Sequence, residues 1–519
     1  MRRTIYQARF MLPVLMLLVF GICGLNAQFA GGNGTLANPY RIQSPEHLNN
    51  VRNYTTSHFV QIADIDLQQY LSAGGAGYNG GQAWEPIGTE TPDMSLRFIG
   101  TYDGNGYLIS NLTINRAGQH YIGLFGFLGV GGGVRNLGLT NVNISGGMQV
   151  GGLVGGTDQT WITNCFVQGS VNATAIAGLL AGSIANGSNV QRCFSTGNVS
   201  ATGNTIGGLM GALSTWSNLN ASYSEADVTS AGEAIGGLVG LNWVNTIMTD
   251  CYSVGMVQSP GDDVGGLTGK QLYDAVAHFC YWDMESSGLV YSASGEGRST
   301  AQMQQQNNYV GWNFNSLWAI NQGSSYPFYQ WQALQMPVFD PEPGVYATPI
   351  DVFLSHSVVR ADIYYRMAQD QDTWSEWFIY DGFGIELPAG HTFSFEAYAD
   401  RAGYHTSATA EATYNIQAVL AMPMADPASG VYTGSVSVVL SSSDSDVQIH
   451  YTTDGSEPTD LSPLYQEPLT FVSDTLLRAK SYKDGWIPSP VLSMEYTIEP
   501  VSVGENVPDH STTKLFSAY

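Results

Sequence analysis

The sequence has few charged residues, and very few of those are basic. Only 12% of its 519 residues are charged, and 18 Lys and Arg stand against 43 Asp and Glu, for a formal net charge of -25. Nucleic acids and anionic membranes are held by Lys and Arg, so this composition excludes both as partners. A disordered chain would contain more charge and fewer apolar residues than the 44% found here. Glycans, cations and proteins remain open as partners.

Long apolar runs are also scarce, and the most prominent one lies at the N-terminus. It extends from Phe10 to Cys23, follows Arg2 and Arg3, and leads to the small residue Ala27. A membrane anchor is the alternative, but the run is shorter than the roughly 20 residues of a spanning helix. The layout is typical of a secretory signal peptide cleaved after Ala27. We expect a secreted or cell-surface protein with no integral membrane segment after cleavage.

Glycine, in contrast, is abundant and recurs in a pattern. The chain has 61 glycines, many of them in Gly-Leu motifs whose leucines lie 26 to 30 residues apart: Leu124, Leu153, Leu179, Leu209, Leu238 and Leu267. Short runs of Val, Ile, Leu and aromatic residues between glycines are typical of strands. A period near 29 with two or three strands predicts the coils of a parallel β-helix, stacked about 4.8 Å apart. We expect glycine both to turn corners at positive φ and to allow close backbone contact.

Cysteine is rare, and four of the five cysteines occupy equivalent places in this repeat. They are Cys165, Cys193, Cys251 and Cys280, and Ser222 takes the place between the two pairs. Stacked coils would place neighbours close enough for Cys165–Cys193 and Cys251–Cys280 disulfides, which export permits. Parallel neighbours in register point their Cβ atoms alike, which favours buried thiols. No His accompanies them at zinc-ligand spacing, so no metal site is expected.

The repeats resemble the GLUG motif of bacterial surface proteins. The motif appears as Gly-Gly-Leu-Val-Gly at residues 151–155 and again at 236–240, and the similarity covers roughly residues 29–332. Trp84-Glu-Pro-Ile-Gly88 resembles the usual start of such proteins, and Cys280-Tyr-Trp-Asp283 their usual end. The resemblance implies a β-helical, adhesin-like surface module.

A tandem pair of another unit follows. Pro337, Asp340 and Tyr346 recur 86 residues later as Pro423, Asp426 and Tyr432, and period-two alternation predicts about seven short strands per copy. Each copy therefore suggests an antiparallel immunoglobulin-type sandwich. The second copy, with Ile449 to Thr459, resembles the C-terminal domain of chitobiase and β-hexosaminidase, which is an accessory domain in those enzymes. The last eight residues resemble the lead-in to a type IX secretion sorting domain, which suggests a truncated chain.

These patterns predict an all-β chain, a parallel β-helix followed by two immunoglobulin-like sandwiches. The expected segments are a signal peptide at 1–27, an N-terminal cap with the first coils at 28–118, the GLUG-repeat β-helix at 119–282, its C-terminal cap at 283–332, a divergent sandwich at 333–418, a chitobiase-like sandwich at 419–498 and a linker at 499–519.

No catalytic set is evident in the sequence. There is no His-Glu-x-x-His motif for a zinc peptidase, and Lys270 is the only lysine before Lys480, although lyases of acidic glycans need basic side chains. Asp64 and Asp66 alternate at strand spacing, so a glycosidase pair stays open, but turn hydrogen bonding is the favoured role. No catalytic residue, cofactor site or metal site is therefore expected.

Three tryptophans are candidates for glycan contact: Trp374, Trp377 and Trp486. Core packing is the commoner fate of Trp in a sandwich, so both roles stay open. We expect a secreted or cell-surface protein without catalysis, adhesin-like, that binds an extracellular glycan or protein. The alternative is an extracellular glycan-binding or glycan-processing protein whose sandwiches bind polysaccharide.

Overall fold

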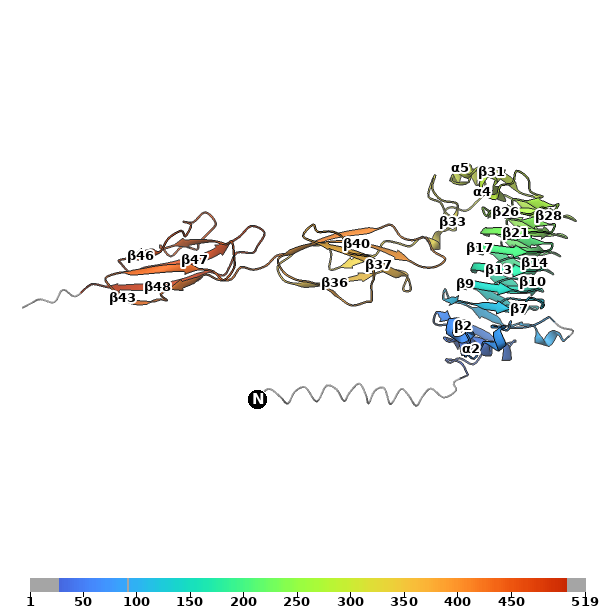
Figure 1. Ribbon diagram of the computed structural model, residues 1–519, viewed down its shortest axis with the longest axis horizontal. Helices are drawn as coiled ribbons and strands as arrows, with labels where there is room; N and C mark the ends of the chain where they lie inside the picture. Colours follow the sequence, from blue (N-terminus) through green and yellow to red (C-terminus); the bar gives the residue numbers. More distant parts are fainter. Residues whose placement is uncertain (1–27, 91–92, 502–519) are drawn as a thin grey trace, which may run out of the picture. The chain divides into compact units, whose positions relative to one another are not determined.

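The computed structural model describes residues 28–90 and 93–501, and the expected signal peptide and the chain after residue 501 lie outside this range. The chain divides into two compact units, residues up to Gln332 and residues from Ala333. The first is a parallel β-helix and the second contains two β-sandwiches, which confirms the expected fold class (Figure 1). Within the described residues, no helix is long and apolar enough to cross a membrane.

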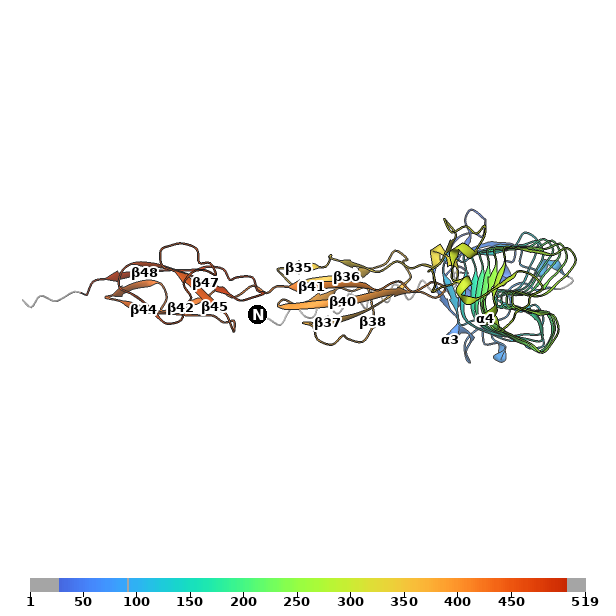
Figure 2. The same ribbon diagram turned by 90° about the horizontal axis from the view of Figure 1, so that it is seen from above.

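Each complete coil of the rod contains four short strands rather than the two or three expected. Figure 2 looks down on the rod, where the outlines of successive coils superimpose. Each sheet is formed by the equivalent strands of successive coils. The first sheet contains β1 (Tyr40–Ile42), β2 (His58–Gln61), β4 (Thr101–Asp103), β8 (Gly133–Arg135), β12 (Trp161–Thr163), β16 (Asn189–Gln191), β20 (Asn218–Asn220), β24 (Ile247–Thr249) and β29 (Val276–His278).

The second sheet contains the longest strands of the rod. Its members are β3 (Ile65–Asp66), β5 (Leu108–Ser110), β6 (Thr113–Asn115), β9 (Gly138–Ser145), β13 (Phe166–Ala173), β17 (Phe194–Ala201), β21 (Tyr223–Ser230), β25 (Tyr252–Ser253), β26 (Val257–Gln258), β30 (Tyr281–Asp283) and β31 (Glu296–Arg298).

Two smaller sheets close each coil. One contains β10 (Met148–Val150), β14 (Ala175–Ala177), β18 (Ile206–Gly207), β22 (Ile235–Gly236) and β27 (Val264–Gly265). The other contains β7 (Phe125–Leu128), β11 (Val154–Thr157), β15 (Ala181–Ile184), β19 (Met210–Leu213), β23 (Val239–Asn242) and β28 (Thr268–Gln271). All six repeat leucines are completely buried along the rod axis, so the period read from the sequence is the period of the core.

Short helices occur mainly at the ends of the rod. They are α2 (Pro45–Asn50), α3 (Gln68–Leu71), α4 (Met284–Ser287) and α5 (Thr300–Met303), with 3-10 turns η1 (Val51–Asn53), η2 (Asn79–Gly81), η3 (Met94–Leu96), η4 (Gln306–Asn308) and η5 (Gln330–Gln332). Ser44 caps α2 by accepting a hydrogen bond from the backbone of His47, and Ser299 and Gln302 form a capping box on α5. These caps satisfy helix ends that would otherwise lack partners.

The motif glycines allow close packing, and the expected corner role is wrong for them. Gly207, Gly236 and Gly265 do not have positive φ. A Cβ atom on Gly236 would lie 2.1 Å from the carbonyl oxygen of Val239, and one on Gly207 would lie 2.2 Å from that of Met210. Any side chain at these positions would collide with backbone.

The corners are turned mostly by residues other than glycine. At one corner, successive coils place six residues in the left-handed region, with φ between 44° and 56°: Asn136, Asn164, Arg192, Ala221, Asp250 and Phe279. Asn adopts this conformation more readily than most residues do. The Asn164 amide also donates to the Asn136 side chain of the preceding coil at 2.9 Å, which links the corners along the rod.

Asp250 is the poorly adapted member of this corner. Burial raises its pKa to about 6, whereas an unfolded Asp titrates near pH 4. The folded state therefore binds the proton more tightly, and stability falls as the pH rises from about 4 to about 6. Asp250→Asn should stabilise the rod at pH 7 by about 1 kcal/mol after allowance for solvent screening, and should change nothing below pH 4. Urea unfolding at pH 3.5 and pH 7 measures this, and an equal gain at both pH values would contradict it.

A stack of aromatic rings runs along the outside of the second sheet. Neighbouring rings of Phe166, Phe194, Tyr223 and Tyr252 lie 4.8 to 4.9 Å apart and within 11° of parallel. This spacing follows from the register of β13, β17, β21 and β25. In each pair of neighbouring strands, the aromatic residue of one strand is the register partner of the aromatic residue of the next.

The end of the first unit folds over this stack. The hairpin of β32 (Trp318–Ala319) and β33 (Phe328–Tyr329) places Trp318 and Tyr329, both completely buried, against the Tyr223 ring. The Tyr329 hydroxyl donates to the carbonyl oxygen of Ala221 at 2.6 Å, and the Tyr252 hydroxyl donates to that of Pro327 at 2.5 Å. Residues 300–332 therefore form a covering segment that keeps the stack out of water.

Each sandwich has two sheets. In the first, β34 (Val338–Asp340), β36 (Ile350–Ser355) and β39 (Ile385–Leu387) face β35 (Gly344–Tyr346), β41 (Ala410–Ile416), β40 (His391–Asp400), β37 (Asp362–Gln369) and β38 (Phe378–Ile379). In the second, β42 (Met424–Asp426), β44 (Val436–Ser441) and β46 (Leu469–Phe471) face β43 (Gly430–Thr433), β48 (Leu492–Glu499), β47 (Thr475–Tyr482) and β45 (Gln448–Thr452).

The two sandwiches repeat the same core contact. The Tyr414 hydroxyl donates to the carbonyl oxygen of Pro341 at 2.7 Å, and the Tyr496 hydroxyl donates to that of Pro427 at 2.8 Å. Both tyrosine rings are buried at the centre of their sandwich. The tandem pattern in the sequence therefore corresponds to two copies of one architecture.

Candidate functional site

Trp374 and Trp377 lie together on the first sandwich, on the segment between β37 and β38. The side chain of Arg366 extends from β37 between them, with its guanidinium carbon 5.0 Å from the Trp374 ring and 4.8 Å from the Trp377 ring. Glu396 on β40 holds that guanidinium through an ion pair of 2.6 Å. Both rings remain more than a third exposed, so they are fixed without being buried.

Backbone contacts explain why this segment is ordered. The backbone N–H of Ser375 donates to the carbonyl oxygen of Met367. In return, the backbone N–H of Met367 donates to the Ser375 hydroxyl at 3.1 Å. The Trp377 ring then meets Tyr398 edge to face at 4.8 Å, and Tyr398 stacks on Tyr364 at 5.1 Å. We call the residues Tyr364, Arg366, Trp374, Trp377 and Tyr398 the tryptophan surface. A rigid, exposed aromatic surface of this kind suits stacking on a sugar ring or on a cation.

Trp486 belongs to the second sandwich and has a different environment. It follows β47, is half-buried, and has the Lys483 ammonium 5.0 Å from its ring. Its backbone N–H donates to the carbonyl oxygen of Lys483, which closes a turn. Sequence reasoning selected all three tryptophans, and the tryptophan surface unites two of them.

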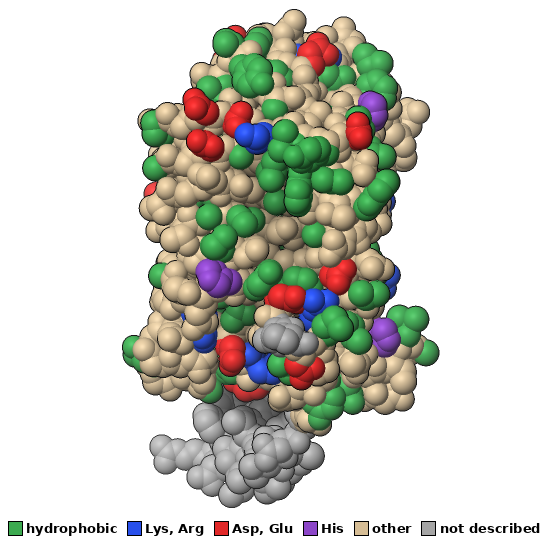
Figure 3. Space-filling model, turned by 90° about the vertical axis from the view of Figure 1, so that its right-hand side faces the viewer, with side chains coloured by type: hydrophobic (Ala, Val, Ile, Leu, Met, Phe, Trp, Pro, Cys, Tyr) green, Lys and Arg blue, Asp and Glu red, His purple; other side chains and the backbone are tan. Residues whose placement is uncertain are grey.

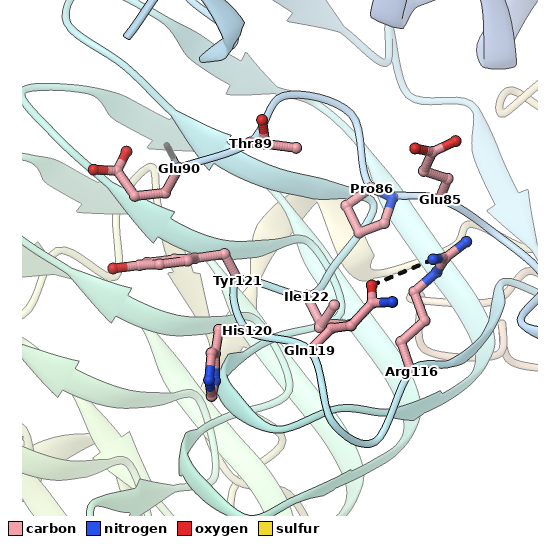
Figure 4. A pocket seen from close by; sticks show the side chains of 9 residues that line it. All are labelled: Glu85, Pro86, Thr89, Glu90, Arg116, Gln119, His120, Tyr121 and Ile122. Atoms are coloured by element: carbon pink, nitrogen blue, oxygen red, sulfur yellow. Dashed lines mark hydrogen bonds between the residues drawn. The ribbon is translucent and has the colours of Figure 1, made fainter. Parts of the chain in front are cut away.

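A small polar pocket lies where the N-terminal cap joins the coils, and sequence reasoning missed it. Its volume is about 130 Å³, and it is lined by Glu85, Pro86, Thr89, Glu90, Arg116, Gln119, His120, Tyr121 and Ile122. Figure 4 shows Glu85 and Glu90 at opposite ends of the pocket. The segments after Ala83 and after Asn115 form it, and the Trp84-Glu-Pro-Ile-Gly88 motif of the first segment indicated a family resemblance rather than a site. The one signal in the sequence is that Arg97 and Arg116, two of the few arginines of the chain, lie in or near these segments.

The charged groups around this pocket are occupied by one another. Glu90 accepts two hydrogen bonds of 2.6 Å from Arg97, and Arg97 also pairs with Asp158 at 2.9 Å. The ring of His120 accepts at Nδ1 from the backbone N–H of Met148 at 3.1 Å. Arg116 donates to the carbonyl oxygen of Trp84 at 3.0 Å. These contacts tie the cap to the coils.

Asp66 has the turn role that the sequence favoured, whereas Asp64 bonds to the backbone of a different coil. Asp66 accepts hydrogen bonds from the backbone N–H of Gln68 at 2.8 Å and from the Asn111 amide at 2.7 Å. Asp64 accepts from the backbone N–H of Leu108 at 2.7 Å. Each carboxylate therefore fixes backbone of the first coils, Asp66 through an Asx turn and Asp64 through a bond between coils.

The four cysteines of the repeat are free and buried. Cys193 donates to the carbonyl oxygen of Gln191 at 3.3 Å, and Cys251 to that of Thr249 at 3.2 Å. Burial raises the pKa of the Cys165 and Cys251 thiols well above the ordinary value. Among the described residues, no group of three or more His, Cys, Asp or Glu side chains could hold a metal ion.

These thiols should not react until the rod unfolds. The native protein should not react with a thiol reagent near neutral pH, because the thiolate is both disfavoured by burial and inaccessible. In guanidinium, four thiols of residues 28–501 should react without added reductant. Thiol titration measures this, and a requirement for reductant would reveal disulfides instead.

Two family models match parts of the chain. The GLUG motif model matches residues 146–172, which include β10, β11, β12 and most of β13, and the model of the chitobiase/beta-hexosaminidase C-terminal domain matches residues 427–493. Both matches fall where the sequence resemblance placed them.

Relatives and solved structures match only parts of the chain or of their own length. A protein described as a Gly-rich membrane protein of Evansella cellulosilytica is 45% identical over 144 residues, 27% of this chain and 16% of its own. Halomucin of Haloquadratum walsbyi is 36% identical over 156 residues, 30% of this chain and 2% of its own. A crystal structure from Bacteroides ovatus, described as an immunoglobulin A1 protease, covers 59% of this chain and 96% of its own at 21% identity and a TM-score of 0.45. The chain therefore carries a GLUG motif in its rod and a chitobiase/β-hexosaminidase C-terminal domain as its last sandwich.

Proposed function

We propose that this protein is secreted or displayed on a bacterial cell surface and acts without catalysis, binding an extracellular glycan or protein in the manner of an adhesin. The observation that carries the proposal is the tryptophan surface, where Arg366 and Glu396 hold Trp374 and Trp377 exposed. A fixed aromatic surface loses little entropy on binding.

The carboxylates considered for an enzyme have structural contacts. Asp64 and Asp66 accept hydrogen bonds from backbone, and Glu90 is held by Arg97. Asp64 and Asp66 are exposed, however, and Asp66 lines an open pocket with Gln68, Gln69 and Ser72, so glycan processing stays the alternative. Glycan binding by the sandwiches is compatible with the tryptophan surface.

Binding assays on variants of this surface test the proposal. Trp377→Ala should weaken binding of the full chain to its cell or glycan target about tenfold, since one stacked ring contributes about 1 kcal/mol or slightly more. Glycan arrays and whole-cell binding measure the effect. Trp331→Ala provides a matched control, because Trp331 is exposed to a similar degree but belongs to the rod.

Two outcomes separate the possibilities. Absence of binding to every glycan and every cell type would overturn the proposal. Loss of binding in Trp486→Ala but not in Trp377→Ala would assign the contact to the second sandwich and the chitobiase-like domain.

A further inference from the structure

One corner of the rod carries large aromatic side chains that point to solvent on three consecutive coils. Trp216 is 65% exposed, Trp243 40% and Tyr273 65%. They lie in the turns that follow β19, β23 and β28, and the backbone N–H of Trp216 donates to Val244 of the next coil at 3.1 Å. The rings of Trp243 and Tyr273 lie 6.4 Å apart. We call Trp216, Trp243 and Tyr273 the corner stripe.

Packing does not explain the corner stripe. The rod core is formed by inward residues such as Leu213 and Leu238, which are completely buried. The rings of Trp216 and Tyr273 keep more than half of their surface in water and add little to that core, and Trp243 is partly exposed. Two or three exposed aromatic residues gathered in one place usually mark a binding surface.

The backbone at this corner is unfavourable for such residues. Trp216 has φ 63° and Tyr273 has φ 49°, in the left-handed region that bulky side chains rarely adopt. The equivalent turn of an earlier coil uses Asn186 and Gly187, which suit this conformation. The chain therefore accepts strain to place aromatic rings where smaller residues would serve the fold better.

The surroundings of the corner stripe indicate an uncharged ligand. Lys270 on β28 is neutralised by Asp263 through an ion pair of 2.5 Å, and Asp274 lies next to Tyr273 in the chain. An anionic polymer would find no free cation here. Figure 3 shows a face of the rod on which hydrophobic side chains gather in the upper part, with acidic side chains and a basic one beside them.

The length of the corner stripe matches a polymer rather than a single sugar. Its residues occupy different positions of the turn on three coils, since Trp243 is the counterpart of Ser214 and not of Trp216. Because coils are stacked about 4.8 Å apart, the stripe extends roughly 10 Å along the rod, and a ligand that contacts all three rings must be an extended chain. We propose that the corner stripe binds a neutral, extended polysaccharide by stacking of its sugar rings. This rests on the proposed extracellular binding function and assigns a ligand class to a second surface, separate in sequence from the tryptophan surface.

Substitutions at the corner stripe can preserve the fold. Trp216→Asn and Tyr273→Asn introduce a residue that the left-handed conformation favours, and Trp243→Ser copies Ser214, its counterpart one coil earlier. The matched control is Phe279→Asn, because Phe279 is 50% exposed and has φ 53° but occupies a different corner. Circular dichroism should show that all four variants melt at or above the temperature of the parent chain.

The test measures retention of the full chain on insoluble cellulose, xylan and chitin, with polygalacturonate as an anionic comparison. We expect retention on at least one neutral polymer and none on polygalacturonate. Each stripe variant should weaken retention about tenfold, and the control should stay within about twofold.

Several results would overturn this proposal while leaving the proposed function standing. In the first, the stripe variants are retained on neutral polymers as well as the parent chain is, whereas Trp377→Ala is not retained. Another is binding to cells that survives periodate destruction of their glycans and depends on the corner stripe, which would make the ligand a protein. A failure of every form of the chain to bind any polymer or cell would overturn both proposals.

Discussion

Gly236→Ala should destabilise the rod by about 3 kcal/mol, although it adds a single methyl group. The added Cβ would lie 2.1 Å from the carbonyl oxygen of Val239 and 2.8 Å from that of Leu267 on the next coil. Both contacts are with backbone, which cannot rotate away as a flexible side chain could. Because each coil stacks on two neighbours, a shift of one coil disturbs the hydrogen bonds on both sides.

The thiols provide a readout that is specific for the rod. Among residues 28–501, all four cysteines lie between residues 165 and 280, so labelling of thiols in increasing denaturant reports rod unfolding and not sandwich unfolding. Gly118→Ala is the control, because a Cβ there has nothing within 4 Å and its φ is not positive. Gly236→Ala should label at clearly lower denaturant than Gly118→Ala. Equal midpoints would contradict the role assigned to the motif glycines.

Trp318→Ala should destabilise the covering segment by roughly 3 to 5 kcal/mol. The indole is completely buried, with the Trp312 ring at 4.5 Å and the Tyr329 ring at 4.8 Å. Its removal would leave a large cavity above the Tyr223 and Tyr252 rings. Residues 300–332 should then become accessible to proteases while the inner coils remain folded.

Trp318→Phe keeps an aromatic ring in place and removes the indole N–H. The buried indole nitrogen of Trp318 has no hydrogen-bond partner, so its loss removes an unsatisfied donor and leaves a smaller cavity. This variant should stay within about 1.5 kcal/mol of the parent chain. Limited proteolysis followed by mass spectrometry measures both variants. Cleavage of 300–332 at the same rate in all three forms would show that Trp318 does not hold the segment in place.

The fold of the rod could be predicted from the sequence because one packing requirement recurs in every coil. A buried leucine and a glycine that tolerates backbone contact must return in every coil, so Leu153, Leu238 and their flanking glycines are visible as a period. The corners carry no such constraint. Residues as different as Arg192, Ala221 and Phe279 adopt the same left-handed conformation at one corner, and glycine does so at other turns such as Gly187, so the expectation of glycine corners holds only in part.

Contacts between distant parts of the chain were the least predictable. Tyr223 and Gln332 are hydrogen-bonded at 3.0 Å although 109 residues separate them, and no local pattern indicates that pairing. The tryptophan surface could be predicted in part. Trp374 and Trp377 were visible as candidates, but the role of Arg366 depends on the position of β37 beside their segment. The exposed rings of Trp216 and Tyr273 were missed because a corner residue faces outward whatever its type.

One measurement tests the central claim, that this chain binds extracellular polymers without cleaving them. The full chain is incubated with neutral polysaccharides, and bound protein and new reducing ends are quantified in the same samples. We expect bound protein and reducing ends equal to those of protein-free samples. Release of reducing ends that persists through purification and disappears in Asp64→Asn or Asp66→Asn would contradict the claim.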